Sequence, residues 1–202
     1  FTVLELEALE ATPDLMNIVL FVMIAIIQGQ FYQSDRRTRK RCIIDEAWRF
    51  LMDGGNFLTA KFIVHGFRTA RKYNAGFTVV TQNQQDTHSV QGEAVAACAD
   101  TKVIMRQGNL TAYLEKHPDA FTPLQQRLLK SFGEAKAQGF SNLMICSGNQ
   151  TTFHRYFCDP FSRVLFSTAG DEFGAVEALL SQGVPLTEAV SRVAQHYYPE
   201  EL

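Results

Sequence analysis

The stretch "RKRCIIDEAWRFL", residues 39–51, decides the fold that this chain is expected to adopt. A basic run leads into the apolar residues 42–44, and the acids Asp45 and Glu46 follow at once. A short, continuously apolar run bounded by polar residues is typical of a strand that is buried in a parallel sheet. The stretch therefore predicts a buried strand with two carboxylates at its carboxyl end.

Working outward, apolar runs alternate with segments of helical periodicity as far as Gly108. The expected strands are residues 1–9, 41–45, 75–82 and 101–107, and the expected helices are residues 12–33, 46–51, 57–74 and 90–100, with a break at 52–56. Thr12, Pro13 and Asp14 suit the start of the first long helix. This alternation predicts an α/β fold with a parallel sheet covered by helices on both faces.

After Gly108 the pattern changes. It predicts two short helices at 111–121 and 122–135, a β-hairpin at 141–159 that turns through 147–150, and a further strand at 162–167. A helical pair follows at 171–183 and 185–198, with Gly183 ending the first helix and Pro185 opening the second. We therefore expect one domain over residues 1–202, with a core at 1–108 and the helices and hairpin at 109–202.

Composition narrows the functional classes. The chain of 202 residues is 46% hydrophobic and has a net charge of -2, so its overall charge points to neither nucleic acid nor an acidic lipid surface. Its four cysteines form no CxxC pair and are expected to be reduced and buried. The longest apolar run, residues 18–27, is half the length of about 20 that spans a bilayer, which favours a helix buried on all sides.

Polar side chains end two of the predicted strands. Asp45 and Glu46 end one, and Thr81 and Gln82 end the next, where open parallel sheets bind their ligands. An apolar strand followed by Asp-Glu is the Walker B pattern, in which the aspartate holds hydrated Mg²⁺ and the glutamate orients the attacking water. The alternative is a helix that begins with acids, with Trp48 anchoring that helix on the sheet.

Basic residues form a second constellation. Arg68, Arg71 and Lys72 share one face of the helix expected at 57–74, and Lys61 and His65 extend that face. The face could be merely solvated, could supply an arginine to a nucleotide on a neighbouring subunit, or could hold the phosphates of a polymer. No GxxxxGK[ST] motif occurs in the chain, so either there is no nucleotide site or the first part of the domain precedes Phe1.

Several longer stretches carry a family resemblance. "IIDEAWRFL", "FIVHGFRTARKYNAGFTVVTQN", "HPDAFTPLQQRLLKSFGEAKAQGFSNLMI" and "FHRYFCDPFSRVLFS" resemble, in order, the C-terminal part of the TraC-type conjugation ATPases of F-type type IV secretion systems. The resemblance spans residues 1–195. It implies a RecA-like P-loop NTPase core that carries Walker B, with the phosphate loop and a channel-docking domain upstream of Phe1.

The resemblance also implies roles for individual residues. Asp45 corresponds to the aspartate that holds Mg²⁺ through water, Glu46 to the catalytic glutamate, and Gln82 to the glutamine after the next core strand. Arg68 and Arg71 fall in the family's basic segment, and either is a candidate for the arginine that acts in trans. Arg106 and Arg155 are weaker candidates for the same role.

The implied cofactors are ATP and Mg²⁺. The implied partners are further copies, commonly in a hexamer, and other secretion components at the cytoplasmic face of the bacterial inner membrane, where such proteins power pilus assembly and the transfer of DNA and protein. Two alternatives stay open: a related DNA-translocating motor, and an interaction module without activity. Direct contact with DNA is left open, and the 202-residue chain by itself is expected to hydrolyse no ATP.

Overall fold

The computed structural model describes residues 2–9, 11–51 and 57–199. The chain divides into two compact units, each of which is described by itself. The first contains Phe1–Val103, Gln107–Ser131 and Cys146–Thr151, and the second contains Ile104–Arg106, Phe132–Ile145 and Thr152–Leu202.

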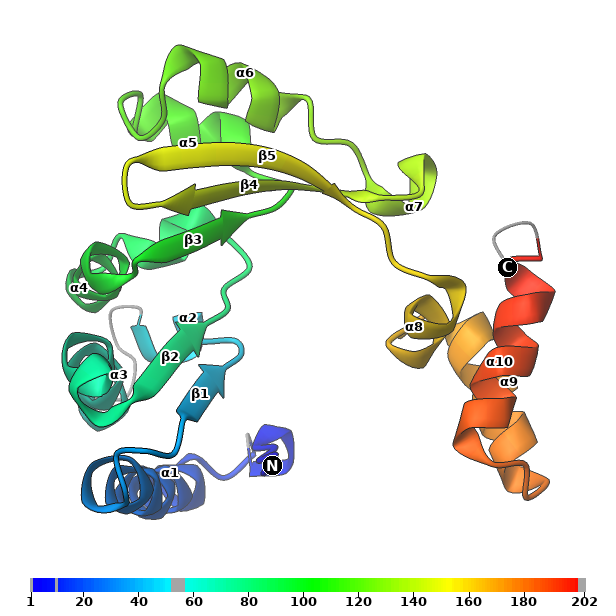
Figure 1. Cartoon of the computed structure of the whole chain (residues 1–202), viewed down its shortest axis with the longest axis horizontal. Helices are drawn as coiled ribbons and strands as arrows, with labels where there is room; N and C mark the ends of the chain where they lie inside the picture. The colour runs from blue at the N-terminus through cyan, green and yellow to red at the C-terminus, as the bar shows by residue number, and fades with distance from the viewer. Residues whose placement is uncertain (1, 10, 52–56, 200–202) are drawn as a thin grey trace. The chain divides into compact units, whose positions relative to one another are not determined.

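Helices and strands follow one another along the chain as Figure 1 shows. The elements up to residue 104 are η1 (Glu7–Leu9), α1 (Pro13–Gln28), η2 (Gly29–Gln33), β1 (Lys40–Ile44), α2 (Trp48–Leu51), α3 (Phe57–Thr69), η3 (Ala70–Tyr73), β2 (Ala75–Val79), η4 (Gln84–Thr87), α4 (Val90–Cys98) and β3 (Thr101–Ile104). Those that follow are α5 (Leu110–Lys116), α6 (Pro123–Lys130), α7 (Ala135–Gln138), β4 (Ser141–Ser147), β5 (Gln150–Tyr156), α8 (Pro160–Leu165), α9 (Gly170–Ser181) and α10 (Leu186–Tyr197).

β1 and β2 form a two-stranded parallel sheet. Their register runs from Lys40 opposite Ala75 to Ile44 opposite Val79, which confirms that the two strands expected to carry the site are neighbours. Side chains alternate along β1, so that Cys42 and Ile44 are half-buried while Arg41 and Ile43 are exposed. Within the part of the chain that the structure describes, the half-buried side chains of β1 thus lie on the face that packs against helices.

The core of the first unit lies on the covered face. It is built around Ala47, Leu51, Phe62, Ile63 and Val95, with Ile44, Phe77 and Val79 of the sheet packed against them. Burying such apolar surface is the main force that holds helices on a sheet. The core therefore fixes α2, α3 and α4 to β1 and β2.

Phe77 is the side chain on which α3 rests. Its ring makes edge-to-face contacts with Phe31 and Phe62 at centroid distances of 5.4 and 5.5 Å. A Cβ atom added to Gly66 of α3 would lie 2.5 Å from this ring, closer than any real contact. Gly66 is needed because the helix backbone lies directly against the phenylalanine of β2.

β3 joins the hairpin of β4 and β5 in a three-stranded sheet of order β3-β4-β5, with the strands antiparallel (Figure 1). The predicted hairpin is confirmed, and Gly148 supplies the left-handed residue of its turn with φ of 55°. The prediction that β3 continues the parallel sheet of β1 and β2 is wrong. An apolar strand sequence does not encode which neighbour completes its hydrogen bonds.

Two further predictions of strands are wrong. Residues 2–6 have no regular structure and lead into η1, because a strand needs a ladder partner and none pairs with them among the described residues. Residues 162–167 fall largely in α8, whose first turn is set by Pro160 and by Asp159, which accepts a hydrogen bond from the Ser162 N–H at 2.9 Å. The expected break at 52–56 lies outside the described residues.

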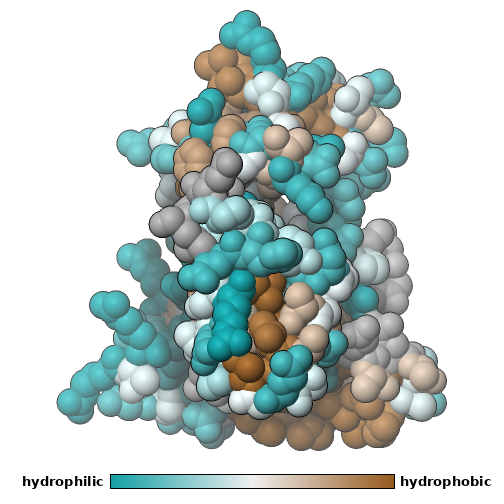
Figure 2. All heavy atoms as spheres, turned by 90° about the vertical axis from the view of Figure 1, so that its right-hand side faces the viewer, coloured by the Kyte–Doolittle hydropathy of each residue, from teal (hydrophilic) through white to brown (hydrophobic). Residues whose placement is uncertain are grey.

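α1 is a helix as predicted, but its predicted burial is wrong. Leu20 is its buried side chain, whereas five other large apolar residues are between 47% and 61% exposed: Leu15, Ile18, Phe21, Val22 and Ile26. Figure 2 shows apolar side chains at the surface along the lower edge of the view, where α1 lies. With η2, the helix runs 21 residues at a mean hydropathy of 1.8, enough by length and composition to cross a membrane, as is also true of many core helices.

The second unit contains a small helical cluster. α8, α9 and α10 pack around Val164, Val190, Val193 and Ala194. The predicted helical pair is confirmed as α9 and α10, and Gly183 between them has φ of 82°. Buried Glu172 accepts a hydrogen bond from the Tyr198 hydroxyl, which ties the start of α9 to the end of α10.

Candidate active site

The chain leaves β1 and β2 at the same edge of their sheet. The Val80 N–H donates to the Ile44 carbonyl at 2.9 Å, and the Ala47 N–H donates to the Val80 carbonyl at 3.0 Å. These two bonds continue the ladder past the last strand residues. They bring the loop that carries Asp45 and Glu46 beside the loop that carries Gln82.

Glu46 and Gln82 are in direct contact. The Gln82 side-chain amide donates to Glu46 Oε1 at 2.8 Å, across 36 residues of sequence. The Trp48 indole N–H donates to Glu46 Oε2, and Arg49 Nε lies 3.9 Å from the same oxygen. The Glu46 side chain is nevertheless 38% exposed, so its carboxylate is positioned and still accessible to water.

The backbone of Glu46 is unusual and explains how its side chain is aimed. Its φ of 52° lies in the left-handed region, which non-glycine residues rarely occupy. The Glu46 N–H donates to Asp45 Oδ1 at 2.8 Å and supports this turn. Such a conformation at a strand end is the kind of local strain that gathers at functional sites.

The pKa of Glu46 is held below its ordinary value of 4.5. The hydrogen bond from Gln82 is the largest cause, followed by that from Trp48. Desolvation opposes them, and the positive charge of Arg49 is the smallest of the lowering causes. Glu46 is therefore a carboxylate at neutral pH. An ionised carboxylate can accept a proton or a hydrogen bond from water.

Asp45 suits a magnesium ion that is shared with a substrate. Its carboxylate is exposed at the end of β1, and Mg²⁺ favours one or two carboxylates together with waters and phosphate oxygens. The described residues contain no group of three or more His, Cys, Asp or Glu that could hold a metal by themselves. The donor set thus fits a hydrated magnesium ion and does not fit a metal cage made wholly of protein.

The loop after Gln82 is fixed at both ends by residues that the sequence reasoning missed. The Gln84 N–H donates to Gln107 Oε1 at 2.9 Å, and His88 Nε2 lies 2.9 Å from the Tyr113 hydroxyl. Gln107 follows β3 as Gln82 follows β2, and that polar strand end is the signal that could have identified it. Thr81 turns its hydroxyl to the Asn83 carbonyl at 3.4 Å, within its own loop.

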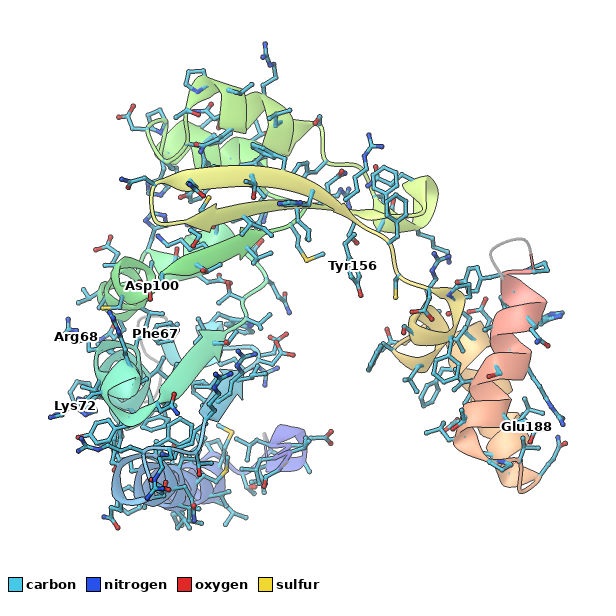
Figure 3. The ribbon with its side chains drawn as sticks, viewed as in Figure 1. Phe67, Arg68, Lys72, Asp100, Tyr156 and Glu188 are labelled. Carbon is cyan, nitrogen blue, oxygen red and sulfur yellow. The ribbon has the colours of Figure 1, made fainter. Side chains whose placement is uncertain are left out.

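The candidate arginines do not join Glu46 within one chain. Arg68 lies in α3 and Arg71 in η3, which leads through Asn74 into the first residue of β2. Both are exposed, and Figure 3 shows Arg68 directed outward from its helix. Because Glu46 and Gln82 follow the last residues of β1 and β2, these arginines lie at the opposite end of the sheet.

The weaker arginine candidates are placed elsewhere. Arg106 is exposed just after β3, and Arg155 of β5 lies with its guanidinium 4.7 Å from the ring centroid of Phe140. Both belong to the second unit. Neither gains support from its local contacts as a catalytic group.

Comparisons with known proteins agree with this picture. Residues 1–197 match the family model described as the TraG P-loop domain. Protein TraC of Escherichia coli (strain K12) is 36% identical over 198 residues, which make up 95% of this chain and 22% of TraC. The structure of VirB4 of Thermoanaerobacter pseudethanolicus is similar with a TM-score of 0.53 at 22% identity, over 73% of this chain and 37% of that one.

These matches confirm the resemblance to TraC-type proteins, and the likeness to VirB4 confirms the α/β fold. The chain spans 22% of the length of TraC and 37% of the VirB4 chain. Both relatives are therefore longer than this chain, which matches only a part of each.

Proposed function

Since the chain belongs to the TraG P-loop domain family, we propose that it supplies the hydrolytic side of the nucleotide site in an ATP-driven motor of a bacterial type IV secretion system. The similarity to TraC, over nearly the whole chain, supports this assignment. The longer protein would contribute the glycine-rich phosphate loop, which these 202 residues do not contain.

One observation carries the proposal. Glu46 and Gln82, from the loops after two parallel strands, meet at 2.8 Å, with Asp45 adjacent in sequence. This is the edge at which open α/β sheets bind ligands. An acid that only began a helix would not need a polar partner from the next strand.

The chain's own residues would divide the work as follows. Asp45 would hold Mg²⁺ through water, and the ion would neutralise charge on the phosphate oxygens. Glu46, ionised at neutral pH, would orient the attacking water and accept its proton. Gln82 would keep the Glu46 carboxylate aimed and would sense the terminal phosphate from the adjacent strand end.

The negative charge that develops on the phosphate oxygens during hydrolysis would also be neutralised by an arginine of another copy of the protein. Arg68 and Arg71 lie at the far end of the sheet from Glu46, which is the arrangement expected of an arginine that acts on a neighbour's nucleotide. We extend the proposal to a homo-oligomer, commonly hexameric in such motors, at the cytoplasmic face of the inner membrane. It would power pilus assembly and substrate transfer together with other secretion components.

The test is Glu46→Gln in the full-length protein. ATP binding should be retained, since the amide keeps the size of the side chain, while turnover should fall by about 100-fold or more because the proton acceptor is lost. Nucleotide binding and phosphate release should be measured side by side. Asp35→Asn, an isosteric change at an exposed acid in the linker before β1, is the matched control and should leave both unchanged. Turnover of Glu46→Gln near the wild-type rate would refute the role of Glu46.

A further inference from the structure

A second polar feature lies at the other end of the β1–β2 sheet. A solvent-open hollow of about 530 Å³ is formed where the two strands begin. Arg39, Lys40, Arg41 and Arg71 line it, and Asp100 is the acid among its described lining residues. The excess of positive charge contrasts with the carboxylates of Asp45 and Glu46 at the opposite edge.

The sheet geometry produces this hollow. Arg39 and Arg41 are two residues apart on extended chain, so they lie on the same side, with Cα atoms roughly 6.6 Å apart. The register places Gly76 opposite Arg41, and a Cβ added to Gly76 would meet nothing within 4 Å. The space in front of Arg41 is therefore open because β2 carries no side chain there.

The wall of the hollow is anchored by other contacts. Lys40 Nζ donates to the carbonyls of Asp35 and Tyr73 at 2.9 and 3.2 Å. The Arg36 guanidinium lies 5.1 Å from the centroid of the Tyr73 ring, and the Tyr32 ring packs on Tyr73 at 4.7 Å. The basic segment before β1 is thus fixed to the turn that carries Arg71.

The three arginines that line the hollow take no part in these contacts with their side chains. Within residues 2–9, 11–51 and 57–199, the guanidinium groups of Arg39, Arg41 and Arg71 have neither a hydrogen-bond nor an ion-pair partner, and all three residues are exposed. Three guanidinium groups that line one concavity repel one another, and a bound anion relieves that repulsion. The planar donor fork of arginine matches phosphate oxygens in two-point hydrogen bonds.

We propose that this hollow binds linked phosphates, at a site separate from the Glu46–Gln82 edge. Two sources share that chemistry: the triphosphate of a nucleotide held by another copy, and the phosphodiester backbone of a nucleic acid. The inference shares Arg71 with the proposed function, but Arg39, Arg41 and Gly76, on which its test rests, have no part in the proposed hydrolysis.

The test is calorimetric titration of the 202-residue chain with sodium tripolyphosphate. EDTA is included, because without a divalent cation the carboxylates of Asp45 and Glu46 repel anions from their own edge. Saturable binding is expected, weakened about tenfold or more by Arg41→Gln, and similarly by Arg39→Gln, since each removes a charge-assisted contact. Arg37→Gln is the matched control: Arg37 is 94% exposed, lies 3.6 Å from Asp35 and is outside the hollow, so its loss should leave the affinity unchanged.

Two further variants separate shape from charge. Gly76→Val fills the open space before Arg41 without altering any charge and should abolish binding. Asp100→Asn removes the acid from the lining and should tighten binding. Absence of tripolyphosphate binding to the wild-type chain, or equal binding by the wild type, Arg41→Gln and Gly76→Val, would overturn the proposal.

Competition then identifies the source of the phosphates. Displacement by a single-stranded oligonucleotide of about 12 nucleotides, weakening steeply with salt, would assign the site to nucleic acid. Displacement by metal-free ATP and not by the oligonucleotide would assign it to a nucleotide. Binding to phosphatidylglycerol vesicles without binding to tripolyphosphate would refute the proposal in favour of a lipid surface. None of these assays measures turnover. Absence of phosphate binding in the hollow therefore leaves the hydrolysis proposal standing, and normal turnover of Glu46→Gln would leave the phosphate-binding proposal standing.

Discussion

At the scale of single residues, the Glu46 carboxylate is held from two sides, by the Gln82 side-chain amide and by the Trp48 indole N–H. The order Asp45, Glu46 after an apolar run and the polar end at Gln82 were enough to predict the candidate site. Trp48 was expected only to anchor its helix on the sheet, but its indole N–H also donates a hydrogen bond to Glu46. That bond depends on the left-handed backbone of Glu46, for which the residue types give no signal.

The single tryptophan makes the ionisation of Glu46 measurable. Because Trp48 donates to this carboxylate, its fluorescence should change when Glu46 is protonated, with a midpoint below the ordinary value of 4.5. The depressed pKa also means that the stability gained from the pairing is present above 4.5 and is lost as the pH falls through the lower folded-state value. A fluorescence titration and a parallel series of urea unfolding curves, both carried from neutral pH downward through the acid range, would measure the two effects.

Gln82→Ala tests the cause of this shift. Removing the largest contribution should move the midpoint of the Trp48 titration upward, toward 4.5. Gln85→Ala, the same change at an exposed position of the same loop, should leave the midpoint in place. A midpoint that stayed unchanged in Gln82→Ala would show that the two side chains do not interact in solution.

At the scale of elements, the sequence predicted helices and hairpins well and strand partners poorly. The hydrophobic periodicity identified α3, α4, α9 and α10, and the Gly148 turn marked the hairpin. The partner of β3 was not predictable, because a strand reads the same whichever neighbour completes its ladder. The apolar residues at 162–167 suggested a strand, but Asp159 and Pro160 just before them are a helix cap and a first helical residue, and they begin α8.

The contact between α3 and β2 gives a prediction about stability. Gly66→Val should destabilise the fold by about 1–3 kcal/mol, because the new atoms collide with a Phe77 ring already confined by Phe31 and Phe62. Gly76→Val is the matched control on β2, where a Cβ meets open space and a β-branched residue suits a strand. Its unfolding free energy in urea should stay within about 0.5 kcal/mol of wild type. Equal losses in the two variants would mean that the α3–β2 packing is looser than described.

At the scale of the whole molecule, the chain forms two compact units, and the first contains Phe1–Val103, nearly all of the core predicted at 1–108. The sequence implied that α1 would be buried because it is apolar on nearly every side. Composition alone does not say what covers such a helix, and within the described chain little of it is covered. The expectation of one domain over residues 1–202 stays a prediction.

The 202-residue chain by itself should not hydrolyse ATP. It carries Asp45, Glu46 and Gln82 but no glycine-rich phosphate loop, so the nucleotide would lack the backbone N–H groups that hold its phosphates. Phosphate release from Mg²⁺-ATP should equal that of the Glu46→Gln version of the same chain. A rate for the wild type that clearly exceeded this background would reveal a nucleotide site that the described residues do not suggest.

The tight seat of Phe77 against Gly66 has a mechanical consequence. With no side chain between them, α3 and the five-residue strand β2 behave as a single stiff piece, closed at one end by the turn at Asn74. We therefore expect the loop that bears Gln82 and the turn that bears Arg71 to move together with this unit.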